Sequence, residues 1–191
     1  MTEEKTDMYE ISRDIERILV GKEELESICD RLAAQITAEY GDSTRDLVMV
    51  VVLKGSIMFA TDLVRRIPRQ VCLEFMKVSS YGAETETSGF IQVHLDLKRD
   101  VRGADVIIIE DIVDSGRTLE KLSGLLANRG AHSVKCCTLL DKPERRQVDF
   151  NADYVGCVVP DVFVVGYGLD YDEKYRNLPY VGVLKPSVYE K

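Results

Sequence analysis

The sequence contains no CxxC pair, no cluster of histidine and cysteine, and no apolar run of the roughly 20 residues that a membrane span needs. The first ten residues, MTEEKTDMYE, are acidic and lack the apolar core of a signal peptide. Five cysteines are present, an odd number, and most lie inside apolar runs where a free thiol behaves as a small hydrophobe. We therefore expect neither a disulfide framework nor a zinc site, and a cytoplasmic location.

Basic residues are also in short supply. Lys and Arg number 25 against 33 Asp and Glu, which gives a formal net charge of −8. A protein that binds nucleic acid or an anionic membrane through charge normally carries a basic surface, so we expect neither as a partner. Taken alone, an acidic net charge does not indicate a polyanionic small molecule as the substrate either. No repeat or linker divides the chain, and residues 1–191 are predicted to form one domain.

The apolar residues alternate between the patterns of strands and helices. Helical spacing is found at 22–40 and at 56–66, where Ile57, Phe59, Leu63 and Val64 are expected to turn inward, and again from about Thr118 to a cap at Gly130. Strands are predicted at 47–53, 72–78, 91–97, 106–109 and 134–140. The polar segment 79–90 is expected to be a long mobile loop. This alternation predicts an α/β fold around a parallel sheet, followed after Lys142 by strands and loops.

The segment 106–119, VIIIEDIVDSGRTL, carries the clearest chemical signal. Its apolar strand is expected to deliver Glu110 and Asp111 to the carboxyl edge of the sheet, where open α/β sheets bind ligands. Residues 114–118 then turn into a helix N-terminus, which offers backbone N–H groups to an anion. Asp and Ser before a helix are commonly only N-caps, but that role does not explain two further carboxylates after an apolar strand. The Walker A pattern is absent.

This segment resembles the phosphoribosyl pyrophosphate motif of type I phosphoribosyltransferases. Further segments are similar to the hypoxanthine-guanine members of that family, in the same order and rough spacing: 53–55 (LKG), 79–82 (SSYG), 140–142 (LDK) and 163–178 (FVVGYGLDYDEKYRNL). The resemblance covers about residues 16–185. It implies a parallel sheet flanked by helices, with a small hood of strand and loop and a mobile lid loop.

The resemblance also implies an enzyme of purine salvage. Such transferases move the 5-phosphoribosyl group of phosphoribosyl pyrophosphate to N9 of hypoxanthine or guanine, and they release pyrophosphate and the nucleotide IMP or GMP. Mg²⁺ is the implied cofactor, and a homodimer or homotetramer is the implied assembly. The sequence leaves open which of the two states forms, and which of hypoxanthine, guanine and xanthine is preferred.

By the same resemblance, residues 114–118 hold the 5-phosphate: Asp114, Ser115, Gly116, Arg117 and Thr118. Glu110 and Asp111 would accept hydrogen bonds from the ribose hydroxyls, as ionised carboxylates do well. Asp114 would also be the catalytic general base or acid near N7 of the purine.

The resemblance assigns pyrophosphate to Lys54, Gly55 and Arg176, and Mg²⁺ to Glu110, Asp111 and Asp170. Oxygen ligands suit Mg²⁺, and the planar fork of Arg suits two phosphate oxygens. Without the resemblance, Lys54 would fit a solvated turn residue equally well, and Arg176 would be a surface residue of a charged segment. The Leu53–Lys54 peptide bond is implied to be strained, and the sequence leaves open whether it is cis.

The purine site is implied to consist of Lys142, Phe163, Val164 and Asp170. Because Lys142 only donates hydrogen bonds, it would accept a 6-oxo group and reject a 6-amino group. Phe163 would stack on the base, although from composition alone it would be a core aromatic. Ser80 and Tyr81 would close as a lid over the reacting groups.

Two other functions compete with this one. Some proteins of this fold sense nucleotides and regulate genes, but such a regulator should have a basic face, which the net charge of −8 disfavours. A transferase that prefers xanthine or adenine is the nearer alternative. His94 and His132 match no part of the implied site, and we interpret both as structural or surface residues.

Overall fold

The computed structural model describes residues 10–80 and 91–190, and within them the largest element is a six-stranded sheet in the order β4-β3-β2-β5-β6-β7. Neighbouring strands are parallel except for β4, which is antiparallel to β3. The strands are β2 (Leu47–Val52), β3 (Cys72–Ser80), β4 (Ile91–Leu95), β5 (Asp105–Val113), β6 (Ser133–Asp141) and β7 (Tyr154–Val158). Every residue of β2 is buried, as its continuous apolar run predicts.

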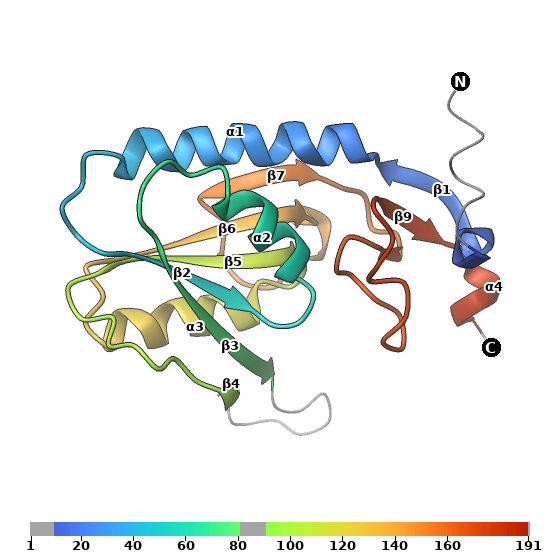
Figure 1. Ribbon diagram of the computed structural model, residues 1–191. Helices are drawn as coiled ribbons and strands as arrows, with labels where there is room; N and C mark the ends of the chain where they lie inside the picture. The colour runs from blue at the N-terminus through green and yellow to red at the C-terminus, as the bar shows by residue number, and fades with distance from the viewer. Residues whose placement is uncertain (1–9, 81–90, 191) are drawn as a thin grey trace.

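Helices cover both faces of this sheet (Figure 1). Helices α1 (Lys22–Tyr40) and α2 (Ile57–Val64) pack on the face that carries Met49 and Ile107, and α3 (Arg117–Asn128) packs on the face that carries Val50 and Ile108. Alternate residues of each strand therefore enter different cores, which is why these strands are apolar throughout. Gly130 follows α3 with φ 87°, in the left-handed conformation expected of its cap. The predicted α/β architecture is confirmed.

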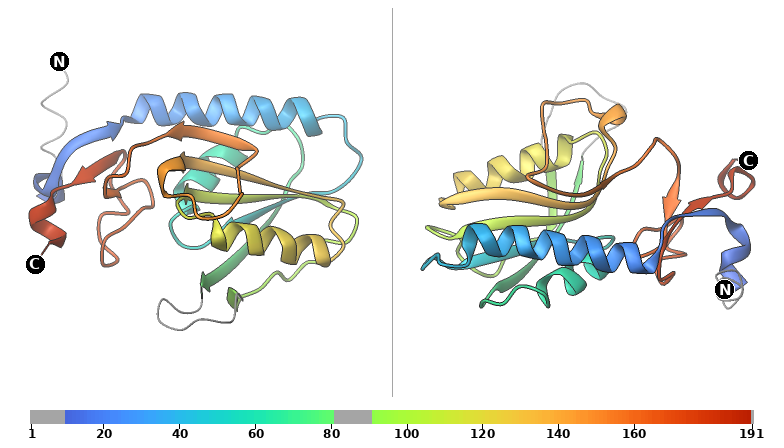
Figure 2. Two further views of the ribbon diagram at one scale, coloured as in Figure 1. Left: turned by 180° about the vertical axis from the view of Figure 1, so that it is seen from behind. Right: turned by 90° about the horizontal axis from the view of Figure 1, so that it is seen from above.

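A small second sheet forms the hood beyond one end of the strands, and both ends of the described chain lie beside it (Figure 2). Its strand order is β1-β9-β8, and both pairings are antiparallel. Its elements are β1 (Ile15–Val20), β8 (Val164–Val165) and β9 (Val181–Leu184), with the short helices η2 (Glu10–Asp14) and α4 (Pro186–Tyr189) nearby. Ile15, Val165 and Tyr175 belong to a separate apolar core there. The strand and loop character expected after Lys142 is confirmed; strand β1 was not predicted.

Several predicted boundaries were wrong. Ile57 was expected to face the core but is 37% exposed, because α2 begins at this residue and only later turns reach the sheet. Strand β5 runs on to Val113 rather than ending before Glu110, since its pairing with β6 continues to Val113 and Asp141. Strand β4 ends at Leu95 rather than at 97.

The predicted loop 79–90 is only partly described. Residues 79 and 80 belong to β3, where they pair with β4, so the strand extends into that range. The proposed lid residue Tyr81 lies outside the described residues, and only the backbone of Ser80 is described. None of the helices in 10–80 and 91–190 combines the length and the apolar character that crossing a membrane demands.

Candidate active site

Strand β5 extends beyond its neighbour β2, and this overhang presents the paired carboxylates. Pairing between the two strands stops at Val51 and Ile109, while β5 goes on beside β6. Glu110 and Asp111 therefore lie on a part of the strand that β2 does not cover, and both are partly exposed. The chain after β2 turns away through Leu53 and Lys54, whose peptide bond is cis.

Three chain segments meet at Gly55 with no room for another methyl group. A Cβ atom built on Gly55 would lie 1.6 Å from Oδ2 of Asp111. A Cβ atom built on Gly168 would lie 1.9 Å from the carbonyl oxygen of Gly55, and Gly168 has φ 105°. Glycine is required at both positions, so the residue 55 turn, the β5 carboxylate and the residue 168 turn form one closely packed unit.

The turn after β5 forms the cradle at the start of α3. Gly116 precedes the helix with φ 80°, and a Cβ atom there would lie 3.0 Å from Cδ of Arg146. Helix α3 begins at Arg117, one residue before the predicted start, so the backbone N–H groups of its first turn have no acceptor within the helix. The backbone N–H of Arg117 lies 3.5 Å from Oγ of Ser115. This is the geometry of an anion site at a helix N-terminus.

The two neighbouring carboxylates have raised pKa values. Burial, followed by the charge of Asp111, raises the pKa of Glu110 well above its usual range. Burial also raises the pKa of Asp111, although a hydrogen bond from Glu110, the backbone N–H of Ile112 and the charge of Arg176 act in the opposite direction. Two carboxyl groups with raised pKa values in one place form a site suited to hydroxyl groups or a cation.

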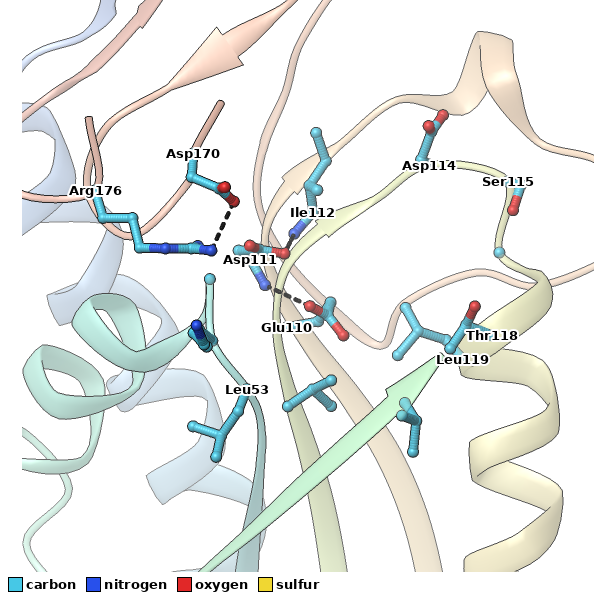
Figure 3. Close-up of a pocket in the computed structure, with 15 residues that line it drawn as sticks. Leu53, Glu110, Asp111, Ile112, Asp114, Ser115, Thr118, Leu119, Asp170 and Arg176 are labelled. Atoms are coloured by element: carbon cyan, nitrogen blue, oxygen red, sulfur yellow. Dashed lines mark hydrogen bonds and ion pairs between the residues drawn. The ribbon is translucent and has the colours of Figure 1, made fainter. Parts of the chain in front are cut away.

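These segments surround a cavity of about 320 Å³. Asp170 and Arg176 lie on one side of it, Ser115 and Thr118 on the other, with Asp111 and Glu110 between them (Figure 3). Lys54 and Gly55 also line it. The structure thus brings the residues predicted for ribose, phosphate and pyrophosphate to one cavity. Arg117 is the exception, because its side chain is exposed and does not line it.

The cationic side of the cavity is already paired within the protein. Arg176 donates through Nη1 to the carbonyl oxygen of Gly168 at 2.8 Å, and its Nη2 lies 2.8 Å from Oδ1 of Asp170. The same Nη2 lies 3.3 Å from Oε2 of Glu173, and Nζ of Lys54 donates to that oxygen at 3.0 Å. Glu173 was not among the predicted site residues.

A second cavity, of about 630 Å³, lies between the main sheet and the hood. Lys142, Phe163 and Val164 line it, as the purine assignment requires, whereas Asp170 lines the first cavity instead. Lys142 is 8% exposed; its Nζ donates to the carbonyl oxygen of Val162 at 2.7 Å and lies 3.6 Å from Oδ1 of Asp161. The hydrogen bond to Val162 uses one of the three N–H groups, so the ammonium group can still donate to a ligand.

Phe163 belongs to an aromatic cluster rather than to the main core. Its ring is 38% exposed and stacks on Tyr189, with centroids 4.9 Å apart and planes at 23°. Tyr171 meets it edge-on at 5.6 Å. The core alternative for Phe163 is therefore wrong, and the exposed part of the ring can contact a flat ligand in the second cavity.

Asp114 is the polar residue that lines both cavities. Its Oδ1 accepts a hydrogen bond from Nε of Arg145 at 2.7 Å, and Nη1 of Arg145 lies 3.4 Å from Oδ2 of Asp161. Arg145 comes from η3 (Pro143–Arg145), directly after the lysine of the second cavity. A proton carrier at this position can serve a group that spans the two cavities.

Sequence reasoning did not predict Arg145 and Tyr189, which line the second cavity. It also did not predict Tyr171 and Glu173, which line neither cavity but contact residues that do. For Arg145, the only signal in the sequence is its position three residues after Lys142. Tyr171 and Glu173 lie inside the matched 163–178 segment, but no pattern within it distinguishes them. Tyr189 joins the site only through the fold of the hood.

The carboxylates could hold Mg²⁺ with help from a ligand. Asp111 and Asp170 supply oxygen atoms to the first cavity, yet no three His, Cys, Asp or Glu side chains in the described parts of the chain converge on one point. Mg²⁺ commonly binds through one or two carboxylates, with waters and substrate phosphates completing the shell. The donor set fits that mode and not an all-protein cage.

Comparison with known proteins agrees with this geometry. Residues 19–172 match the model of the phosphoribosyl transferase domain. The hypoxanthine-guanine phosphoribosyltransferase of Bacillus subtilis is 50% identical over 180 residues, covering 94% of this chain and 99% of that protein. The enzyme of the same name from Staphylococcus epidermidis is 49% identical over 179 residues, with the same coverage.

A solved structure shares the fold over nearly the whole chain. The crystal structure of a hypoxanthine phosphoribosyltransferase from Staphylococcus aureus superposes with a TM-score of 0.92 at 46% sequence identity. The alignment covers 97% of this chain and 100% of that one. The hood and the main sheet are therefore both present in that protein.

Proposed function

The chain belongs to the phosphoribosyltransferase family, and we propose that it acts on 6-oxopurines, as a hypoxanthine-guanine phosphoribosyltransferase of purine salvage. It transfers the 5-phosphoribosyl group of phosphoribosyl pyrophosphate to N9 of hypoxanthine or guanine, and releases pyrophosphate with IMP or GMP. One observation carries the proposal: two cavities of different chemistry, one charged and one partly aromatic, meet at Asp114.

Phosphoribosyl pyrophosphate occupies the first cavity in this proposal. The N-terminus of α3, with Asp114, Ser115, Gly116, Arg117 and Thr118, receives the 5-phosphate, since its free N–H groups and helix dipole favour an anion. Glu110 and Asp111 accept hydrogen bonds from the ribose hydroxyls. Because the side chain of Arg117 is exposed, we expect this residue to bind the 5-phosphate through its backbone N–H only.

Pyrophosphate leaves from the opposite side of that cavity. Lys54, Gly55 and Arg176 hold it; Arg176 supports this role because its Nε is buried without a partner among the described residues. Asp170, with Asp111 and Glu110, holds Mg²⁺ directly or through water. When bound, Mg²⁺ neutralises charge that develops on the leaving pyrophosphate.

The purine occupies the second cavity. It stacks on Phe163, the free N–H of Lys142 donates to O6, and the backbone of Val164 and the Asp170 region meet its edge. The bond from ribose C1 to pyrophosphate oxygen breaks as the bond to N9 forms, through an oxocarbenium-like transition state. The proton lost by the purine passes to Asp114. Ser80 and Tyr81 are proposed as the lid that excludes water.

The test is an assay with phosphoribosyl pyrophosphate, Mg²⁺ and four bases in parallel: hypoxanthine, guanine, xanthine and adenine. We expect turnover of hypoxanthine, guanine or both, and no turnover of adenine, because Lys142 cannot accept a hydrogen bond from a 6-amino group. Absence of turnover with every base would refute the enzymatic function. Turnover of adenine alone would refute the role of Lys142.

The protein is also proposed to form a homo-oligomer, a dimer or a tetramer. Ile57 and Met58 of α2 are 37% and 40% exposed, and Leu73 and Phe75 of β3 are 43% and 39% exposed. Leu73 and Phe75 pair in register with Met49 and Val51, so they face the same side of the sheet as α1 and α2. A second copy of the chain would cover this apolar patch.

A cytoplasmic location is also proposed. All five cysteines are free thiols, and free thiols are typical of proteins in a reducing compartment.

A further inference from the structure

Glu173 connects the two cations that the proposed function assigns to pyrophosphate. A single oxygen, Oε2, accepts a hydrogen bond from Nζ of Lys54 at 3.0 Å and lies 3.3 Å from Nη2 of Arg176. Lys54 follows β2 and Arg176 lies about 120 residues later, so this carboxylate joins two distant segments. Nothing in the proposed reaction uses Glu173 itself.

Glu173 acts from outside the cavity. Lys54 and Arg176 both line the first cavity, whereas Glu173 does not and is 64% exposed. The guanidinium of Arg176 is divided between protein acceptors, Gly168, Asp170 and Glu173, and only its Nε is left buried without a partner among the described residues. Before any ligand binds, most of the positive charge in the cavity is therefore already matched by carboxylates.

The backbone holds Glu173 in this position. Its N–H donates to Oδ2 of Asp170 at 2.9 Å, and its φ of 62° places it in a tight left-handed turn. Hydrogen bonds from Lys54 and then Arg176 lower the pKa of Glu173, so the side chain is ionised at neutral pH. The carboxylate is thus a negative charge that its contacts with Lys54 and Arg176 keep beside both cations.

We propose that Glu173 is an internal counter-anion that occupies Lys54 and Arg176 in the free enzyme and so weakens the binding of pyrophosphate. The inference rests on the proposed function, which places pyrophosphate at these two cations. An incoming pyrophosphate oxygen has to compete with Oε2 for the same N–H groups, and it also meets the repulsion of a nearby negative charge. The product of the reaction consequently leaves more easily.

The experiment compares the native protein with Glu173→Gln and Glu173→Ala by calorimetric titration with pyrophosphate and Mg²⁺. Glutamine keeps an oxygen that can orient both cations but removes the charge, and alanine removes both. We expect the Kd for pyrophosphate to fall about two- to fivefold in both variants at low ionic strength, the size of an exposed charge interaction. This increase in pyrophosphate affinity should be smaller in 0.5 M salt, where charges are screened within a few ångströms.

Asp172→Asn is the matched control. It removes the same charge from the neighbouring residue, whose carboxylate pairs with Lys174 at 3.5 Å and touches neither cation. We expect its pyrophosphate affinity to equal that of the native protein. In steady-state assays, Glu173→Gln should lower the KM for phosphoribosyl pyrophosphate and leave the KM for hypoxanthine unchanged.

Each outcome decides the matter. An unchanged or weaker affinity in Glu173→Gln would overturn the inference, and so would an equal gain in Asp172→Asn. Weaker binding in Glu173→Ala alone would mean that Glu173 only orients the cations. If the native protein turns over hypoxanthine but Glu173→Gln does not bind pyrophosphate more tightly, the role of Glu173 as a counter-anion is refuted and the proposed function stands. If no variant binds pyrophosphate, both fail.

Discussion

Among single residues, Asp114 has the position with the greatest consequence, because it lines both cavities. Asp114→Asn keeps the shape of the side chain and removes its ability to take a proton. We expect kcat for hypoxanthine to fall about 10²- to 10⁴-fold, the usual contribution of a general acid or base. An unchanged thermal transition and unchanged IMP binding would establish that the fold is intact. Full activity would exclude Asp114 as the proton carrier.

Gly55 illustrates a residue whose importance is purely spatial. Gly55→Ala places a methyl group 1.6 Å from Oδ2 of Asp111, so either the turn or the carboxylate must move. We expect the KM for phosphoribosyl pyrophosphate to rise at least tenfold, roughly 1.4 kcal/mol of lost binding.

Gly124→Ala is the control for that substitution. Gly124 lies within α3, and a Cβ atom there meets nothing within 4 Å. Because alanine is the better helix former, this variant should be about 1 kcal/mol more stable and equally active. Chemical denaturation and steady-state kinetics measure both quantities, and equal kinetic effects of the two substitutions would contradict the steric argument.

Glu110 gives a prediction about pH. Its pKa is raised in the folded protein from an ordinary value of 4.5, so between that value and the raised pKa the folded state binds more protons than the unfolded state. The stability of the ligand-free protein should therefore fall as pH rises through this window. Glu110→Gln, which cannot ionise, should be more stable than the native protein at pH 7.5 and bind phosphoribosyl pyrophosphate less tightly. Thermal melts from pH 4 to 8 test this; a native curve parallel to that of the variant would contradict it.

At the scale of elements, the turn that carries Asp170 is tied to α2 by one aromatic side chain. Tyr167 has φ 51°, and its hydroxyl donates to Oδ2 of Asp62 at 2.6 Å. Tyr167→Phe removes that hydrogen bond and keeps the ring. We expect about 1 kcal/mol of lost stability and a higher KM for phosphoribosyl pyrophosphate, because the turn loses its anchor. Unchanged stability and kinetics would show that backbone packing alone holds the turn.

The elements also show how far sequence patterns reach. Buried strands such as 47–53 were predictable because both faces contact helices and the apolar run is unbroken. Strand β1 was not, because its residues IERILV alternate imperfectly and only Ile15 and Val20 are buried. Strand β5 was predicted too short, since its last residues carry charge and are held by β6, a pairing that no local pattern reveals.

The same limit applies to the site. The end of β5 and the turn after it carry a local signal, so Glu110, Asp111 and residues 114–118 could be predicted as a ligand site from residue types alone. Lys54, Lys142 and Arg176 needed the family resemblance, because a lone cation in a turn is usually a surface residue. Arg145, Glu173 and Tyr189 could not be predicted, because their roles depend on distances between segments far apart in the chain.

At the scale of the whole molecule, the apolar patch on α2 and β3 predicts association. Phe75→Glu places a charge in that patch on a residue that is already 39% exposed, so the fold should survive. We expect the oligomer to dissociate, as measured by sedimentation at micromolar concentration. Val158→Glu is the control, because Val158 is 65% exposed on β7 at the opposite edge of the sheet. A native protein that sediments as a monomer would refute the proposed assembly.

The meeting of two cavities at Asp114 has a consequence for inhibitor chemistry. A fragment that fills only the aromatic cavity, or only the charged one, loses its translational freedom for a modest number of contacts. A single compound that joins a purine to a phosphonate across Asp114 loses translational freedom only once. After one part of it binds, the other part is present at a high effective concentration near its own cavity. The linker should be short and should carry a group that donates a hydrogen bond to the carboxylate. Selectivity would then depend on the link as much as on either end.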